Sequence, residues 1–178
     1  MITQQGKLKV SKLREIDIPV LAKWLSDPRV LRYYEGRDRP QTPRMIRRKF
    51  LKGGGRERLV RCIAECRGMK IAYLQFYLAN KKEYELDDAK GVYAMDLFIG
   101  EPRLWGKGIG TKLVKMLLSY LHGVKKAPSV VIDPQVTNKR AVRCYEKCGF
   151  KKVKVLRRHE WHEGRWRDCW LMARSWTR

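Results

Sequence analysis

The chain has 178 residues, of which 44% are hydrophobic, and its formal net charge is +23. This length is typical of one domain with room for a core, so we expect a single domain over residues 1–178. No stretch approaches the ~20 consecutive apolar residues of a membrane span. The N-terminal sequence also lacks the charged-then-apolar pattern of a secretory signal. We therefore expect a cytoplasmic protein without a membrane partner.

Cysteine usage argues against both a disulfide framework and a metal centre. The chain has five cysteines, an odd number, without an export signal. Cys62 and Cys66 lie on a predicted strand, where four residues span ~13 Å, too far for shared metal ligation. Cys144 and Cys148 share a predicted helix face and are expected to be buried. The histidine pair within 159–162 has no cysteine or carboxylate at ligand spacing, so no metal site is predicted.

The high positive charge raises the question of a nucleic-acid partner. The basic residues are spread along the chain, and no recognised nucleic-acid motif accompanies them. We interpret them as a solvated basic surface that also attracts polyanionic ligands, although the charge alone leaves a nucleic-acid partner open. The main basic segments are 44–49, 56–61, 151–158 and 165–178.

The first half of the chain predicts a strand, short helices and a hairpin. Alternating polar and apolar residues predict a strand at 7–13. Asp17 is a candidate N-cap and Pro19 suits a first helical turn, so a helix is expected through residue 25. The further elements expected here are helices at 30–34 and 42–51, the second ended by the glycines at 53–55, and hairpin strands at 58–66 and 70–79.

The second half alternates strands with amphipathic helices. In chain order we expect a strand at 91–100, a helix at 108–121, a buried strand at 129–132, a helix at 137–147, and an antiparallel pair at 153–158 and 168–174 around a turn at Glu163-Gly164. Together these elements predict an α/β fold with a sheet of mixed strand direction.

Three glycines at alternate positions, Gly106, Gly108 and Gly110, connect the strand at 91–100 to the following helix. Glycines allow the backbone to approach a ligand closely, and the free amides at a helix start attract anions. The spacing is not that of a nucleotide-hydrolase loop. Thr111 stands where the dinucleotide fingerprint needs a glycine. The segment therefore predicts a phosphate-binding loop of another kind, with a glycine-rich turn as the alternative.

Two motifs in this half resemble those of the GCN5-related N-acetyltransferases. Arg103-x-x-Gly106-x-Gly108 resembles their acetyl-CoA pyrophosphate loop, and Asn138-x-x-Ala141-x-x-x-Tyr145 resembles the motif that follows it. A helix start and a core tyrosine are the alternative reading of the second motif. Within this superfamily the chain most resembles the aminoglycoside 6'-N-acetyltransferases. The matching segments are 71–77, 91–96, 105–114, 133–138 and 140–150, with Tyr33-Tyr34 at the place of a tryptophan pair. The resemblance covers residues 8–150 and is weakest at 80–90.

The resemblance implies a fold and a donor. The fold is a central, mixed but mostly antiparallel sheet of about seven strands, flanked by helices and splayed between the fourth and fifth strands. The donor is acetyl-CoA, and the family uses no metal. The residues implied in coenzyme binding are Leu97, Phe98 and Ile99 of the strand, Arg103, Leu104, Trp105, Gly106, Lys107, Gly108, Ile109, Gly110 and Thr111 of the loop, and Asn138 and Tyr145.

The resemblance also assigns two catalytic roles. Tyr145 matches the tyrosine that protonates the leaving thiolate, and Asp96 matches an aspartate implicated in amine deprotonation, directly or through water. A structural partner for an arginine is the alternative role for Asp96. An amine needs no covalent enzyme intermediate, so the cysteines are not needed as nucleophiles.

An aminoglycoside acceptor is a polycation, and local carboxylates are expected to attract it despite the net positive charge. Tyrosines are expected to stack on its sugar faces, with core packing as the alternative for Tyr77 and a solvated loop as the alternative for 83–88. The expected acceptor-binding residues are Tyr33, Tyr34, Tyr77, Glu83, Glu85, Asp87, Asp88, Asp96 and Asp133.

Two other functions stay open at this point. The same chemistry can act on a protein N-terminus, a lysine or a siderophore precursor. A basic nucleic-acid or ribosome-binding module that lost the chemistry is the third reading, against which the intact glycine loop, Asn138 and Tyr145 argue. Either a monomer or a homodimer fits the sequence.

Overall fold

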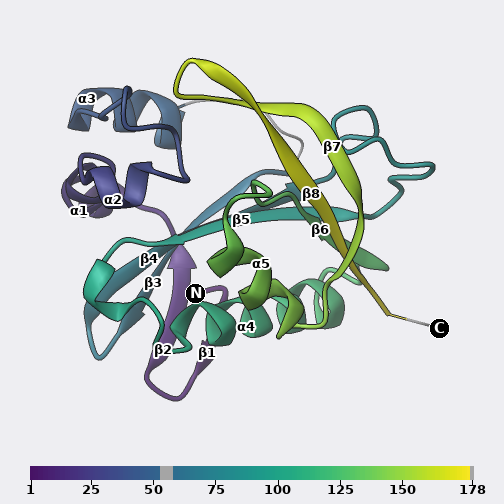
Figure 1. The fold of residues 1–178 in the computed structure, drawn as a ribbon. Helices are drawn as coiled ribbons and strands as arrows, with labels where there is room; N and C mark the ends of the chain where they lie inside the picture. The colour runs from purple at the N-terminus through teal and green to yellow at the C-terminus, as the bar shows by residue number, and fades with distance from the viewer. Residues whose placement is uncertain (53–57, 177–178) are drawn as a thin grey trace.

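The computed structural model describes residues 1–52 and 58–176. Within them the strands and helices follow in the order β1 (Thr3–Gln5), β2 (Leu8–Lys12), α1 (Ile18–Trp24), α2 (Pro28–Leu31), α3 (Pro43–Ile46), β3 (Val60–Cys66), β4 (Met69–Leu78), β5 (Tyr93–Ile99), α4 (Ile109–Gly123), β6 (Ser129–Ile132), α5 (Lys139–Glu146), β7 (Lys151–His162) and β8 (Arg165–Ser175). Short helical turns at Glu15–Asp17, Arg47–Lys52 and Pro102–Leu104 complete the described secondary structure. Figure 1 shows how these elements are arranged.

The described strands form one eight-stranded sheet in the order β1-β2-β3-β4-β5-β6-β8-β7. All neighbouring pairs are antiparallel except β5 and β6. This confirms the predicted mixed, mostly antiparallel sheet, with one more strand than the expected seven. The additional strand is β1, a three-residue polar edge strand that pairs with β2. It carries no alternation of polar and apolar residues, which is why the sequence did not predict it.

The predicted splay lies between β5 and β6. These parallel strands pair only at Tyr93 with Val130 and at Ala94 with Val131. The remaining part of β5, residues 95–99, has no β6 partner, so one edge of its backbone is open to a ligand. The predicted strands begin with β2, so β5 and β6 are the fourth and fifth of them. This gap is therefore the one that the sequence predicted.

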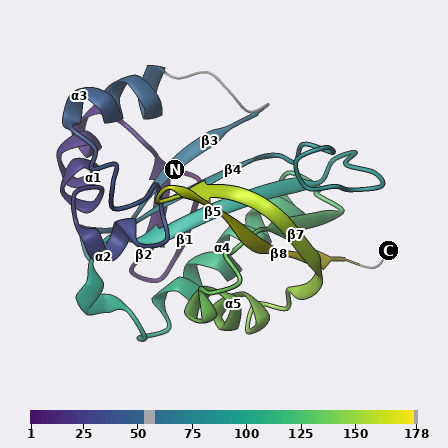
Figure 2. The ribbon, with the colours of Figure 1, turned by 45° about the horizontal axis from the view of Figure 1, so that its top comes forward.

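Helices cover both faces of the sheet (Figure 2). The apolar stripe of α4, including Leu113 and Leu117, packs with Leu74 and its neighbours in the main core. On the other face, α1 to α3 pack in a second cluster that contains Tyr73. Adjacent residues of β4 thus serve opposite faces, as the two-residue period of a strand requires.

Two details at the helix starts and ends differ from the predictions. Asp17 occupies the N-cap position of α1, but its carboxylate accepts from the Arg14 backbone N–H at 2.8 Å and pairs with Lys70 Nζ at 2.6 Å. The helix expected over 42–51 is α-helical only to Ile46 and continues as a π-helical turn. The expected glycine stop at 53–55 lies outside the described residues.

The last two strands, β7 and β8, are considerably longer than predicted. Their turn lies at the predicted Glu163-Gly164 pair, where both residues have positive φ. The pairing of β7 with β8 is irregular near Lys152 and between Leu156 and Glu160. These irregularities interrupt the alternation of polar and apolar residues along β7, so the sequence did not predict its full length. The hairpin tip extends toward the segment after α2 (Figures 1 and 2), and this placement shapes the site described next.

Candidate active site

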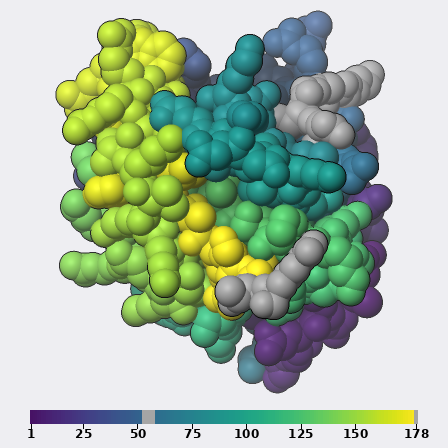
Figure 3. Space-filling view, turned by 90° about the vertical axis from the view of Figure 1, so that its right-hand side faces the viewer, coloured from purple at the N-terminus to yellow at the C-terminus, as the bar shows by residue number. Residues whose placement is uncertain are grey.

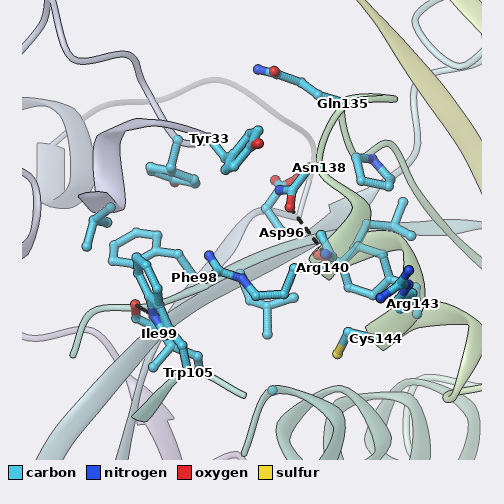
Figure 4. Close-up of a pocket in the computed structure, with 18 of the residues that line it drawn as sticks. Tyr33, Asp96, Phe98, Ile99, Trp105, Gln135, Asn138, Arg140, Arg143 and Cys144 are labelled. Carbon is cyan, nitrogen blue, oxygen red and sulfur yellow. Dashed lines mark hydrogen bonds between the residues drawn. The ribbon is translucent and has the colours of Figure 1, made fainter. Parts of the chain in front are cut away.

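A cavity of about 690 Å³ lies at the splay, between β5, the glycine loop, α5, the segment around α2 and the tip of β7. Figure 4 shows its lining, with Asp96 and Asn138 near the centre, Tyr33 on one side and Trp105 on another. The predicted site residues that line it are Tyr33, Tyr34, Asp96, Leu97, Phe98, Ile99, Leu104, Trp105, Gly106, Gly108, Ile109, Gly110, Thr111, Asp133, Asn138 and Tyr145. The described lining does not include Tyr77, Glu83, Glu85, Asp87, Asp88, Arg103 or Lys107.

The glycine loop provides the features that an anionic group needs. Gly106 and Gly108 both have φ of +75°, a conformation that side-chain-bearing residues rarely adopt, and a Cβ added at either would meet nothing within 4 Å. Gly108 is also the N-cap of α4 and gives it no side-chain cap. The first amides of α4 therefore face an open cradle that fits a pyrophosphate.

Two basic residues of the loop region lie outside this cradle. Arg103, on the turn after β5, directs Nη2 to the sulfur of Met69 at 3.3 Å and its Nε to Glu101 at 3.7 Å. Lys107 is exposed. Other basic residues at this end of the cavity are Arg140, Arg143 and Lys147. All three lie within or near the second motif, but the sequence predicted no role for them.

Trp105 connects the loop to both walls of the cleft. Its indole Nε1 donates to the Ile99 carbonyl at 2.9 Å, which folds the loop back onto the end of β5. The Arg140 guanidinium of α5 lies over its ring, 3.9 Å from the centroid. This cation–π contact spans the cleft between the loop and α5.

Asn138, the N-cap of α5, and Tyr145 within α5 both line the cavity. Asn138 accepts a hydrogen bond from the Ala141 N–H at 3.2 Å and so caps α5, while its side-chain amide nitrogen is left as a donor. The Tyr145 ring is buried beside Phe150, with ring centroids 5.9 Å apart. Burial raises the pKa of Tyr145 well above its usual range, so the hydroxyl stays protonated and able to donate.

Asp96 is held by neutral donors from the neighbouring strand. Gln75, its direct partner in the β4–β5 register, donates Nε2–H at 2.6 Å, and the Tyr77 hydroxyl donates at 3.2 Å. The Tyr77 and Tyr84 hydroxyls are bonded to each other at 2.7 Å. Both rings are buried, so they support Asp96 from the core and do not offer stacking surfaces to a ligand.

Two further carboxylates face the same part of the cavity. Asp133, just after β6, accepts from His159 Nε2 at 2.9 Å, and this hydrogen bond raises the pKa of His159. Glu160 of β7 accepts from Gln135 Nε2 at 3.0 Å, and burial raises the pKa of its carboxyl group. Glu160 was not among the predicted site residues, because it lies in a charged stretch beyond the family resemblance. It reaches the cavity only because β7 is longer than predicted.

The acidic segment 83–88 lies elsewhere. Glu85 pairs with Lys154 of β7 at 3.0 Å, and Asp88 accepts from the Lys90 N–H at 2.8 Å. Figure 3 shows the teal β4–β5 connection beside the yellow-green residues of β7 on the outer surface. These acids lie close together in the sequence, but they do not line the cavity, because the β4–β5 connection folds onto β7. Glu85, Asp87 and Asp88 are exposed there.

The two tyrosines after α2 form the opposite wall. The Tyr34 ring lies 4.6 Å from Phe98 of β5, between centroids, and burial raises the pKa of Tyr34. The Arg32 guanidinium lies over the Tyr33 ring at 5.4 Å. Trp161 at the β7 tip, 45% exposed, completes an aromatic rim. The cavity therefore has a cradle with basic residues at one end and carboxylates with aromatic rings at the other, where Arg29 and Arg39 also reach the lining.

Comparison with known proteins shows which family the chain belongs to. The model of the acetyltransferase (GNAT) domain family matches residues 14–158. The chain belongs to this family. An aminoglycoside N(6')-acetyltransferase type 1 of Klebsiella pneumoniae is 30% identical over 144 residues, covering 79% of this chain and 72% of the relative. An N-alpha-acetyltransferase of Sulfurisphaera tokodaii is 41% identical over 66 residues, covering 37% of this chain and 38% of the relative.

Solved structures share the fold of this GNAT acetyltransferase. Aminoglycoside acetyltransferase AAC(6')-Ib in complex with coenzyme A and kanamycin matches with a TM-score of 0.78 at 24% identity, covering 94% of each chain. Spermidine N-acetyltransferase from Vibrio cholerae in complex with coenzyme A and spermine matches with a TM-score of 0.78 at 18% identity, covering 96% of each chain. The predicted superfamily, its fold and acetyl-CoA as donor are thereby confirmed.

Two features are absent from the described residues of the GNAT chain. None of its described helices is long and apolar enough to cross a membrane. Over the same described part, no group of three or more histidine, cysteine or acidic residues is arranged to hold a metal ion.

Proposed function

We propose that this enzyme transfers the acetyl group of acetyl-CoA to an amine of an aminoglycoside, at the 6' position, and thereby confers resistance. The observation that carries the proposal is the convergence of Asp96, Asp133 and Glu160 on one cavity, opposite a cradle for a pyrophosphate. The relatives named for aminoglycoside acetylation support it. The proposed enzyme is a single domain over residues 1–178.

The acceptor end suits a polycation in spite of the net charge of +23. Exposed charges farther than about 8–10 Å are screened at physiological salt, so nearby carboxylates dominate over the remote basic surface. Tyr33, Tyr34 and Trp161 line the same region and provide aromatic surface for the sugar rings.

In the proposed reaction the amine attacks the thioester carbonyl directly within a ternary complex. Asp96 takes the proton of the ammonium group, directly or through one water, and frees the nitrogen lone pair. A backbone N–H on the open edge of residues 97–99 stabilises the oxyanion. The C–N bond forms first and gives the tetrahedral oxyanion, which then collapses with cleavage of the C–S bond. Tyr145 donates its hydroxyl proton to the leaving thiolate and regains a proton, directly or through water, from the amine nitrogen, which loses its second proton as the amide forms. The proton taken by Asp96 passes to solvent.

The experiment is to follow thiol release from acetyl-CoA with kanamycin, tobramycin and a basic peptide. Faster release with the aminoglycosides than with the peptide supports the proposal, and NMR of the product identifies the acetylated nitrogen. Acetylation at another amine would correct the position only. If no aminoglycoside accelerates release, the proposed acceptor is wrong; release with the peptide would then favour a protein N-terminus or lysine as the acceptor.

A further inference from the structure

His162 is a buried histidine at the tip of β7 whose two ring nitrogens face different parts of the protein. It is 2% exposed. Its Nε2 lies 3.0 Å from the Arg32 carbonyl oxygen, in the segment after α2. A carbonyl oxygen can only accept, so Nε2 carries a hydrogen and donates it. This bond joins the hairpin tip to a segment 130 residues away.

The second nitrogen, Nδ1, is buried and has no aligned hydrogen-bond partner among the described residues. Glu160 Oε1 is the carboxylate oxygen it faces, at 3.3 Å. In the neutral ring with hydrogen on Nε2, the buried Nδ1 presents a lone pair to the carboxylate of Glu160, whose side chain is partly exposed, so two acceptors face each other. That arrangement is unfavourable unless a proton lies between them.

The charges around this pair come from several elements. Glu163 Oε1 lies 3.9 Å from Nε2, and Glu163 is itself bound by Arg37 at 2.6 Å. Around Glu160 lie Gln135, which donates to Oε2, Cys169 of β8, and Asp133 with its partner His159. The nearby Asp133 charge opposes a full negative charge on Glu160, which also favours retention of a proton by the pair.

We propose that His162 is a positioning residue that shares one proton with Glu160 through Nδ1. The shared proton fixes a cavity-lining carboxylate to the hairpin tip, and the Nε2 bond fixes the tip to the segment after α2. Because Glu160 contacts the acceptor in the proposed function, its orientation by His162 rests on that function. The proton sharing itself is a property of the unliganded protein.

Two substitutions test the contacts of the two ring nitrogens one at a time. In His162→Asn the side-chain amide nitrogen takes the place of Nδ1 and can still donate toward Glu160. In His162→Gln the amide nitrogen takes the place of Nε2 and keeps the bond to the Arg32 carbonyl, but the Glu160 contact is lost. Both variants lack a titrating ring, and each serves as the control for the other.

We expect His162→Gln to raise the KM for tobramycin roughly three- to tenfold, as for the loss of one ordinary hydrogen bond, with kcat and the KM for acetyl-CoA within twofold of the parent. His162→Asn should restore most of the tobramycin affinity. The ratio of the parent's KM to that of His162→Asn should rise with pH as the shared proton is lost, since the amide cannot lose its proton. An unchanged tobramycin KM in His162→Gln would overturn the role in positioning.

Nitrogen-15 NMR of the imidazole rings tests the shared proton without any acceptor, and the chain has only three histidines to assign. We expect Nε2 to stay protonated throughout, and Nδ1 to gain its proton at a lower pH in Glu160→Gln than in the parent. An identical titration of Nδ1 in both proteins would refute the proposal. If no aminoglycoside is acetylated, the proposed function fails. This measurement still decides whether His162 and Glu160 share a proton.

Discussion

At the scale of single residues, Asp96 is the carboxylate whose surroundings best suit proton removal. It lies on β5 beside the splay, and Gln75 and Tyr77 hold it through neutral donors. We expect Asp96→Asn to lower kcat by ~10²–10⁴, the usual range for loss of a general base, with the KM for acetyl-CoA unchanged. Asp88→Asn is the matched control, since Asp88 is acidic but lies outside the cavity lining. Equal turnover in the two variants would remove Asp96 from catalysis.

Tyr145 is expected to act through its hydroxyl group and not through its ring. Tyr145→Phe keeps the contact with Phe150, so the fold should be unaffected while transfer slows by up to ~10²–10⁴, or less where water substitutes. The thiolate of a more acidic thiol leaves with less need of protonation. With such a thioester as donor, the difference in transfer rate between the parent and Tyr145→Phe should be smaller. The same loss with both donors would mean that Tyr145 does not protonate the leaving group. Steady-state kinetics with the two thioesters distinguish these results.

The residue scale also shows which of the predicted site residues line the cavity and which do not. Gly106, Gly108, Asn138 and Tyr145 were predicted because their roles depend on local backbone and fixed helical spacing, and all of them line the cavity. Which carboxylates line the cavity depends on contacts between elements far apart in the sequence. Acids at 83–88 were expected there because they are close together in the sequence, yet β7 supplies Glu160 instead.

At the scale of elements, the β7–β8 hairpin tip forms part of the cavity wall and is anchored by Glu163. Arg37 donates to Glu163 from its backbone N–H and from two guanidinium nitrogens, at 2.6–3.0 Å. These bonds lower the pKa of Glu163 to about 2 from an ordinary 4.5, so their stabilisation is fully present above that ordinary value and is lost as the pH falls toward 2. Between pH 5 and 8 the anchor is therefore intact.

We expect Glu163→Gln to loosen the tip without unfolding the protein. Hydrogen exchange should quicken in residues 160–166 and 32–38, and the acceptor KM should rise several-fold, while the melting temperature changes little because the pair is on the surface. Asp168→Asn is the control, because Asp168 pairs with Arg157 on the same hairpin but away from the tip. Exchange at 32–38 that stays slow in Glu163→Gln would show that the tip is held by other contacts.

Elements with regular periodicity were predicted with the right type and nearly the right limits. The apolar stripe of α4 and the paired strands β3 and β4 are examples. The errors fall where periodicity is absent or interrupted: the polar edge strand β1, the π-helical turn after α3, and the far half of the β7–β8 hairpin, whose pairing shifts between Leu156 and Glu160. In these places pairing partners, and not the local sequence, decide the conformation.

At the scale of the whole molecule, the net charge of +23 should act differently on the two substrates. Acetyl-CoA is a polyanion attracted by the whole basic surface, whereas a cationic acceptor is repelled at long range and attracted only by carboxylates within the cavity. Raising KCl from 50 to 500 mM shortens the screening length from roughly 14 to 4 Å and removes the long-range part of both effects. We therefore expect the KM for acetyl-CoA to rise several-fold. The KM for tobramycin should change little or fall, because the long-range repulsion is screened as well.

Steady-state kinetics across this salt series, with sucrose of matched osmolality as the control, measure the difference. A tobramycin KM that rises as steeply as that for acetyl-CoA would contradict the prediction, because it would require attraction of the acceptor from outside the cavity. The acidic 83–88 segment would then be its nearest source, and neutralising Glu85, Asp87 and Asp88 together should flatten that salt dependence. If attraction is confined to the cavity, the same triple variant leaves the tobramycin KM unchanged at every salt concentration, since these three side chains are exposed and do not line the site.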